Sequence, residues 1–211
     1  MKKALILVLA LVMVCMSTFA CAESLQITPG APSNCDIDSF KMYFSMMAGA
    51  SGYNFIWQDN VTSENGYDVY KADSEDGLMT LSIYVQGGKV VYGEAIGSIT
   101  ASASDSSSAS KFGEWFGASI AGMVLGMYIG ENGMNAVTDS VGTQFQNDLM
   151  PLVQVLQNGL TTPTALMNGL ASVSTVAGYP TGLEVSGSVS GTSITLNMRI
   201  IVASPGCTVT K

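Results

Sequence analysis

The stretch LEVSGSVSGTSITLNMRI, residues 183–200, decides the fold because its polar and apolar residues alternate on both sides of a short turn. With the turn at Gly191-Thr192, this alternation predicts a β-hairpin in which Val189 faces Ile194. Further from the turn, the same register pairs Gly187 with Leu196, Val185 with Met198 and Leu183 with Ile200. A slip of one residue would turn all of these side chains to the opposite face, so the pattern specifies the pairing.

The second face of this hairpin is polar. It carries the hydroxyl, amide and acidic side chains of Glu184, Ser186, Ser188, Ser190, Thr195 and Asn197, and the register sets Glu184 opposite Arg199. An antiparallel sheet with one apolar face needs a cover on that face, and helices are the only cover that the rest of the chain offers. The sequence therefore predicts an α+β fold, with an antiparallel sheet of about six strands covered on one face by helices.

The first half of the chain supplies the remaining strands. We expect strands over residues 53–58 and 67–71, followed by a hairpin over residues 79–99 with its turn at Gly87-Gly88. In the simplest register of this hairpin, Glu94 falls on the apolar face together with Tyr92. A carboxyl group in apolar surroundings has a raised pKa, which makes Glu94 a candidate general acid of a carboxylate-dependent hydrolase. A bulge or a shifted register would instead turn Glu94 to solvent, and no partner carboxylate is identifiable for it.

Helical spacing predicts four helices. Asp36 or Asp38 is placed to cap the first, which starts near Ser39. After a serine-rich link near residues 100–110, we expect helices over Ser110–Gly130, Met134–Asn158 and, more briefly, Pro163–Val173.

The helix over residues 115–130 is free of charge and apolar all round, and small residues recur at every fourth position: Ala118, Gly122, Gly126 and Gly130. Such spacing lets another backbone approach closely, in membranes and in tightly packed cores alike. The run would be about 24 Å long as a helix, against about 30 Å of hydrocarbon in a bilayer. We therefore expect a core helix packed on the sheet or on the helix Met134–Asn158. Membrane insertion of residues 115–130 is the alternative, and self-association is a third.

The first residues have the form of a bacterial export signal. Lys2 and Lys3 precede an apolar run over residues 4–14, and Ala20-Cys21-Ala22 matches the pattern cleaved by a signal peptidase. We expect a signal peptide over residues 1–22, an N-terminal extension over 23–35 and one domain over 36–211. The protein would then be exported, as a secreted or cell-envelope protein. Lipidation of Cys21, which would anchor it to a membrane, is the alternative.

Two cysteines remain after the signal, Cys35 before the first helix and Cys207 after the last strand. An even pair in an exported chain predicts a disulfide, which here would staple the two ends of the domain. The alternative is a reactive thiol, which the absence of histidine disfavours.

The composition excludes several chemistries. The chain has 211 residues, no histidine and a net charge of −8, which falls to about −10 without Lys2 and Lys3. Without histidine there is no Ser-His or Cys-His nucleophile and no His-ligated metal. Dinucleotide and phosphate-loop motifs are absent as well, so we expect no metal and no cofactor. The negative charge disfavours nucleic acid as a partner.

What remains favours binding over catalysis. The candidate binding residues are aromatic strand residues and methionines of the apolar helix: Trp57, Tyr84, Tyr92, Met123 and Met127. Together they predict an exported, non-enzymatic binding protein for an apolar small molecule, a glycan or a surface protein. The hydrolase based on Glu94 and the membrane-active protein based on residues 115–130 are the alternatives.

Overall fold

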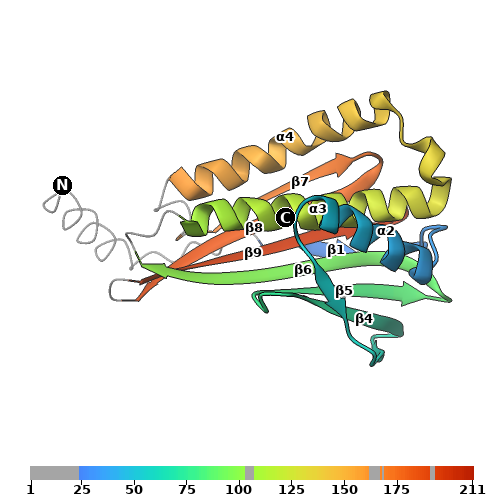
Figure 1. The fold of residues 1–211 in the computed structure, drawn as a ribbon, viewed down its shortest axis with the longest axis horizontal. Coiled ribbons are helices and arrows are strands. Elements are labelled where there is room, and N and C mark those ends of the chain that lie inside the picture. Colours follow the sequence, from blue (N-terminus) through green and yellow to red (C-terminus); the bar gives the residue numbers. More distant parts are fainter. Residues whose placement is uncertain (1–23, 103–106, 162–166, 168, 191–192) are drawn as a thin grey trace, which may run out of the picture.

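A computed structural model describes residues 24–102, 107–161, 167, 169–190 and 193–211. It shows an eight-stranded antiparallel sheet with helices on one face, which confirms the expected α+β fold (Figure 1). The strand order is β2-β4-β5-β6-β9-β8-β7, and β3 pairs with β4 beside this path. The strands are β2 (Phe55–Trp57), β3 (Thr62–Glu64), β4 (Tyr67–Ser74), β5 (Met79–Gln86), β6 (Lys89–Ser102), β7 (Leu170–Val176), β8 (Tyr179–Ser190) and β9 (Ser193–Ala203).

The C-terminal hairpin has the register that its alternation predicts. Val189 faces Ile194, Leu183 faces Ile200 and Glu184 faces Arg199. Strand β9 then pairs on its other side with β6 over eleven residue pairs, from Tyr92–Ala203 to Ser102–Ser193. This long pairing joins the two halves of the chain into one sheet. The turn residues 191–192 lie outside the described part of the chain.

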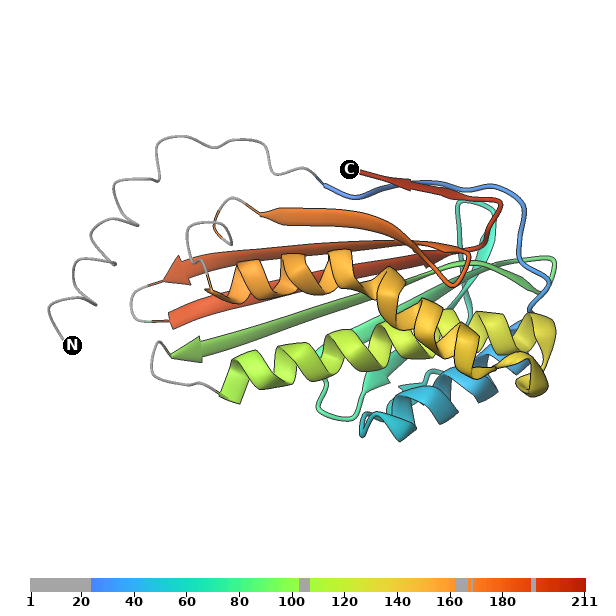
Figure 2. The ribbon, with the colours of Figure 1, turned by 90° about the horizontal axis from the view of Figure 1, so that it is seen from above.

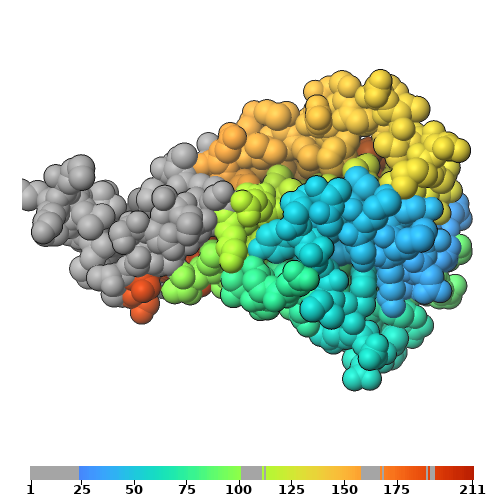
Figure 3. Space-filling model, viewed as in Figure 1, coloured from blue at the N-terminus to red at the C-terminus, as the bar shows by residue number. Residues whose placement is uncertain are grey.

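Helices α2 (Ile37–Ala50), α3 (Ser107–Asn132) and α4 (Asp139–Thr161) cover the apolar face of the sheet. Asp36 caps α2 as expected, because its side chain accepts a hydrogen bond of 2.8 Å from the backbone N–H of Ser39. Seen from above, α3 lies over the middle of the sheet between α2 and α4 (Figure 2). In the space-filling view α2 and α4 form the outer surface of the helix layer, and α3 shows in the strip between them (Figure 3).

Two glycines of α3, Gly122 and Gly126, face α2. A Cβ atom at Gly122 would lie 2.7 Å from the Phe44 ring, and one at Gly126 would lie 3.3 Å from the Phe44 backbone nitrogen. The sequence predicts that this stripe of small residues packs on the sheet or on the helix that follows α3. That prediction is wrong, because the stripe packs on α2. Large residues of α3 also sit on sheet glycines: Trp115 lies over Gly97 and Met123 over Gly93. The helix is buried in the core on both sides, and this close approach offsets its poor helix propensity.

Three helix boundaries differ from expectation. A short 3₁₀ helix, η2 (Met134–Ala136), separates α3 from α4, so the helix expected from Met134 begins at Asp139 and runs through Pro151 to Thr161. The helix expected over residues 163–173 is wrong in its second part, because Leu170–Val176 form the strand β7. Its first part, like the signal peptide, falls outside the described residues.

The two ends of the chain are joined by backbone pairing. Strand β1 (Gln26–Thr28), within the expected N-terminal extension, pairs antiparallel with β10 (Thr208–Thr210). This β1–β10 ribbon packs its apolar side chains on the sheet face opposite the helices, with Leu25 only 2% exposed. The extension is thus an ordered part of the fold, lying beside the C-terminal strand (Figure 2).

The structure corrects the expected disulfide, because Cys35 and Cys207 are both free and buried. They pack on opposite sides of strand β6: Cys35 joins the core under the helices, and Cys207 joins the small cluster under the β1–β10 ribbon. Burial, and then the negative charges of Asp36 and Glu131, raise the pKa of the Cys35 thiol to about 12. The Cys35 thiol is therefore protonated at neutral pH and a poor nucleophile.

Two glycines of α3 provide a matched stability test. Gly117→Ala adds a methyl group where no atom lies within 4 Å, so we expect the free energy of unfolding to rise by up to about 1 kcal/mol from helix propensity. Gly122→Ala forces the buried Phe44 ring to move, so we expect a loss of about 1–3 kcal/mol. Urea unfolding followed by circular dichroism measures both, and equal effects would contradict the packing of α2 on α3.

The state of the cysteines is open to direct chemical measurement. Alkylation of a chain of residues 23–211 in denaturant without reductant, followed by mass spectrometry, should add two labels per chain, because the structure holds both Cys35 and Cys207 free. The native protein should react slowly, since both thiols are buried. A denatured, unreduced chain that takes up no label would show that a Cys35–Cys207 disulfide forms after all.

Candidate functional site

The sheet face opposite the helices is a largely polar surface of the described chain. No described helix lies against this uncovered face, and the β1–β10 ribbon covers only its end near Gly182 and Ile201. The strand registers align its side chains in rows. One row runs across seven strands and consists of Ile56, Asp73, Thr80, Ile96, Arg199, Glu184 and Ala171.

A β-bulge in β6 decides which residues reach this face. Tyr84 pairs with Tyr92, whereas Val85 pairs with Val90, so Val91 is an extra residue on β6. The bulge turns Tyr92 and Glu94 away from the helices. The expectation that Glu94 lies on the apolar face is therefore wrong, and the shifted register is the arrangement that the structure has.

Three tyrosines form a cluster on the uncovered face. The rings of Tyr84 and Tyr92 stack with their centroids 4.1 Å apart, and Tyr67 packs edge-on against both, at 6.3 and 6.2 Å. Burial, followed by neighbouring groups that include the Glu94 carboxylate, raises the pKa of both Tyr84 and Tyr92. Both hydroxyl groups are therefore protonated at neutral pH and able to donate hydrogen bonds.

Beside the tyrosine cluster, Glu94 belongs to a charged network. The Arg199 Nε atom lies 2.5 Å from Glu94 Oε1, and Arg199 Nη1 lies 3.7 Å from Glu184 Oε2. Glu184 and Arg199 also bind the backbone of Leu25. Glu184 accepts a hydrogen bond from the Leu25 N–H at 3.3 Å, and Arg199 donates one to the Leu25 carbonyl oxygen at 2.9 Å. The network thus fastens the N-terminal segment to the sheet. An ion-paired Glu94 without a second free carboxylate gives the hydrolase hypothesis no geometric support.

The other candidate binding residues lie elsewhere. Trp57 is on the helix side of β2, where its ring packs against Phe44 and its Nε1–H donates to Ser45 at 3.1 Å. Met123 and Met127 are fully buried between α3 and the sheet, where they fill the core. Of the five residues that the sequence singles out for binding, the structure brings only Tyr84 and Tyr92 together.

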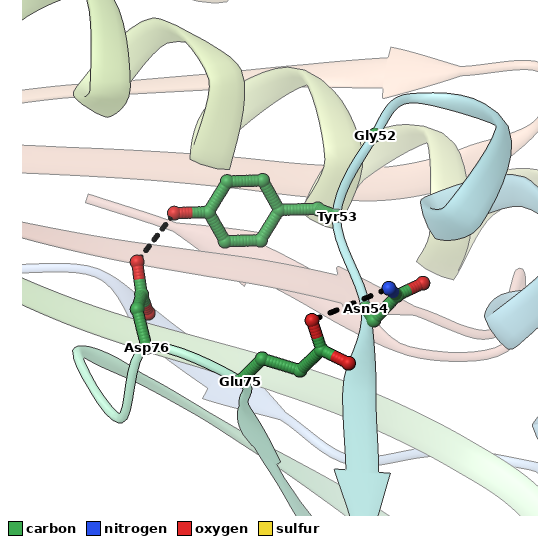
Figure 4. A pocket seen from close by; sticks show the side chains of 5 residues that line it. All are labelled: Gly52, Tyr53, Asn54, Glu75 and Asp76. Carbon is green, nitrogen blue, oxygen red and sulfur yellow. Dashed lines mark hydrogen bonds between the residues drawn. The ribbon is translucent and has the colours of Figure 1, made fainter.

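Sequence reasoning did not anticipate a pocket of about 200 Å³ lined by Gly52, Tyr53, Asn54, Glu75 and Asp76 (Figure 4). In this pocket the Tyr53 hydroxyl donates to Asp76 at 2.7 Å, and Asn54 donates to Glu75 at 3.3 Å. Asp76 also accepts from Ser74 at 2.6 Å and lies 3.4 Å from Lys111 Nζ. Burial opposes ionisation of Asp76, but the hydrogen bonds from Ser74 and Tyr53 outweigh it and lower its pKa.

This pocket acts as a structural junction. Asp76 connects the turn between β4 and β5 to Tyr53, and the Tyr53 hydroxyl in turn accepts from the Trp115 indole of α3. Burial, and then the hydrogen bond to Asp76, raises the pKa of Tyr53. Since the carboxylate oxygens of Asp76 already have partners, the arrangement explains how the start of α3 is held to the sheet without requiring a ligand.

Comparison of the chain with models of known protein families, with curated proteins and with solved structures found no match. In the described ranges, no group of three His, Cys, Asp or Glu side chains is placed to hold a metal ion. None of the helices described is both long enough and apolar enough to cross a membrane. The candidate site therefore depends on the geometry of the uncovered face alone.

Removing the charge at Arg199 tests the network on this face. Arg199→Gln leaves two partly buried carboxylates, Glu94 and Glu184, without their cation, so we expect the free energy of unfolding to fall by about 1–3 kcal/mol. Lys71→Gln is the matched control, because its pair with Glu64 is longer, at 3.7 Å, and more exposed. It should cost less than about 0.5 kcal/mol. Equal losses in urea unfolding would show that the network contributes no more than a surface pair.

Proposed function

We propose that this chain is an exported glycan-binding protein and that the uncovered face of the sheet is its binding surface. The observation that carries the proposal is an uncharged band of hydroxyl and amide side chains on this face, separated from the tyrosine cluster by the charged network of Glu94, Arg199 and Glu184. This hydroxyl–amide band consists of Ser98, Thr100, Ser186, Ser188, Thr195 and Asn197, which stand in two rows across β6, β9 and β8.

The chemistry of the band matches a neutral polyol. Hydroxyl and amide groups both donate and accept hydrogen bonds, as sugar hydroxyls do. The band is partly organised by its own cross-strand contacts, because Ser98 donates to Asn197 at 2.9 Å and the Thr100 and Thr195 hydroxyls lie 2.9 Å apart. Asn197 keeps its side-chain N–H groups for a ligand, since it uses its oxygen in the first of these contacts. Side chains held on strands lose little conformational entropy on binding.

Apolar contact next to the band would come from Ile96. Ile96 is 49% exposed and lies two positions before Ser98 on the same face of β6. The C–H groups of a sugar ring would rest on Ile96 while its hydroxyls reach the band. The half-buried tyrosines lie further along the same face, where their rigid rings with a polar tip would meet a more distant sugar of a longer chain.

The distribution of charge favours a neutral glycan over an anionic one. The whole chain has a net charge of −8, and the band itself carries no charged residue. An acidic polysaccharide would be repelled by the protein as a whole, whereas a neutral one would meet no electrostatic barrier. The other two ligand classes have less support: the methionines expected to line an apolar groove are core residues, and a protein partner would need no uncharged hydroxyl surface.

Affinity electrophoresis tests this function. Gels that contain a soluble neutral polysaccharide, such as starch, hydroxyethylcellulose, xylan or galactomannan, should retard the exported chain in at least one case. Asn197→Ala should weaken that retardation by about tenfold in the dissociation constant, or about 1.4 kcal/mol, because it removes amide donors from the middle of the band. Asn147→Ala, on an exposed position of α4, is the control and should leave retardation unchanged.

Three outcomes would overturn the proposal. The first is a folded protein that no neutral polysaccharide retards. The second is retardation to which Asn197→Ala makes no difference, which would place binding on another surface. The third is stronger retardation by an acidic polysaccharide than by any neutral one, which would contradict the role assigned to charge.

A further inference from the structure

Strand β7 (Leu170–Val176) forms one border of the sheet (Figure 2). Both of its faces are covered. On the helix side Ser174 donates to the Asp148 carbonyl of α4 at 2.9 Å, and on the other side Ala171 and Val173 pack on the cluster under the β1–β10 ribbon. Its inner edge is bonded to β8, and no described residue pairs with its outer edge. What β7 leaves open is therefore its outer backbone.

The opposite border of the sheet has features that prevent it from pairing with another chain, and β7 lacks these features. That border is built from β2 and β3, which are three residues each and are joined by a loop containing Asp59. Short strands and charges are the devices that prevent a sheet edge from pairing with another chain. By contrast, β7 has seven residues, LASVSTV, with no charge and no proline. Such an edge is a template for one more strand.

The hairpin turn determines which backbone groups of β7 point outward. Ala177 and Gly178 have φ angles of 49° and 90°, as a two-residue hairpin loop requires, and Val176 and Tyr179 close the hairpin. The closing pair is hydrogen-bonded, and pairs alternate along an antiparallel ladder. The outward N–H and carbonyl groups are therefore those of Ala171, Val173 and Thr175.

The sequence of β7 is self-complementary about the central one of these residues. If a second β7 lies antiparallel with Val173 facing its own copy, Ala171 faces Thr175 of the second copy, and all outward groups are paired. On the helix side the same register sets Ser172 against Ser174 and Leu170 against Val176. Apart from Ala171 with Thr175, side chains of like polarity thus meet, and no two like charges are opposed.

We propose that β7 is an interaction surface for a second copy of this chain, which adds its own β7 across a two-fold axis at Val173. The two sheets become one continuous antiparallel sheet of two protomers, with the helices of both on the same side. Because each protomer carries a net charge of −8 or below, the two repel, so association should strengthen as salt is added. The proposal does not depend on glycan binding. If both hold, two binding faces lie side by side and bind a polymer with avidity.

The test measures the mass of the exported chain by light scattering behind size exclusion, over about a hundredfold range of concentration and at low and high salt. We expect a shift from monomer to dimer as concentration rises, at lower concentration in high salt. Thr175→Pro removes one outward N–H without touching the bonds to β8, so it should shift dissociation by about tenfold or more. Thr175→Val keeps that N–H and the shape of the side chain, so it should dimerise as the native chain does.

Amide hydrogen exchange gives a second measurement on the unmodified chain, should the proline variant fold poorly. The amides of Ala171, Val173 and Thr175 should exchange slowly at high protein concentration and rapidly after dilution. A monomeric mass over the whole range, a dimer that Thr175→Pro leaves unchanged, or rapid exchange of these amides within a dimer would each overturn the proposal. Glycan binding by a monomer would be unaffected by any of these results.

Discussion

The extra residue Val91 in strand β6 is the constraint on which the uncovered face depends. Without it the hairpin of β5 and β6 would keep a simple register, and Glu94 would lie beside Leu81 under the helices. With it, Tyr92 reaches Tyr84 for stacking, and Glu94 reaches Arg199 on the next strand. The tyrosine cluster and the pairing of Glu94 with Arg199 both follow from this one insertion, because a shift of one residue exchanges the two faces of a strand.

Glycine organises the helix side of the molecule in a comparable way. Gly122 and Gly126 of α3 make room for Phe44 of α2, and Gly97 of the sheet makes room for Trp115 of α3. Helix α3 therefore approaches both α2 and the sheet closely, at a cost in helix propensity that burial offsets. As a result Met123 and Met127, which the sequence suggests for binding, fill the core, and the surface left for binding is the opposite, polar face.

The sequence predicts the C-terminal hairpin correctly because its alternation is strict and its turn is short. It does not reveal the bulge, since Val90 and Val91 are both apolar and either fits the core. The sequence also does not determine which element packs on the glycines of α3. Small residues indicate that another backbone approaches closely, but they do not identify that backbone. Strands β1 and β10 have three residues each, which is too short for an alternating pattern of polar and apolar residues to be recognised. The sequence therefore predicts that Cys35 and Cys207, rather than backbone pairing, join the two ends of the domain. Strands that are far apart in the sequence can pair without leaving a recognisable pattern in the residues of either strand.

The register of β5 with β6 is the point to measure first, and nuclear Overhauser contacts between backbone protons of the two strands report it directly. A register with the bulge places Ser82 opposite Glu94, and cross-strand contacts should therefore connect these two residues. Contacts of Ser82 with Gly93, and of Leu81 with Glu94, would show a strand without the bulge. Glu94 would then lie under the helices, and the uncovered face described above would not exist.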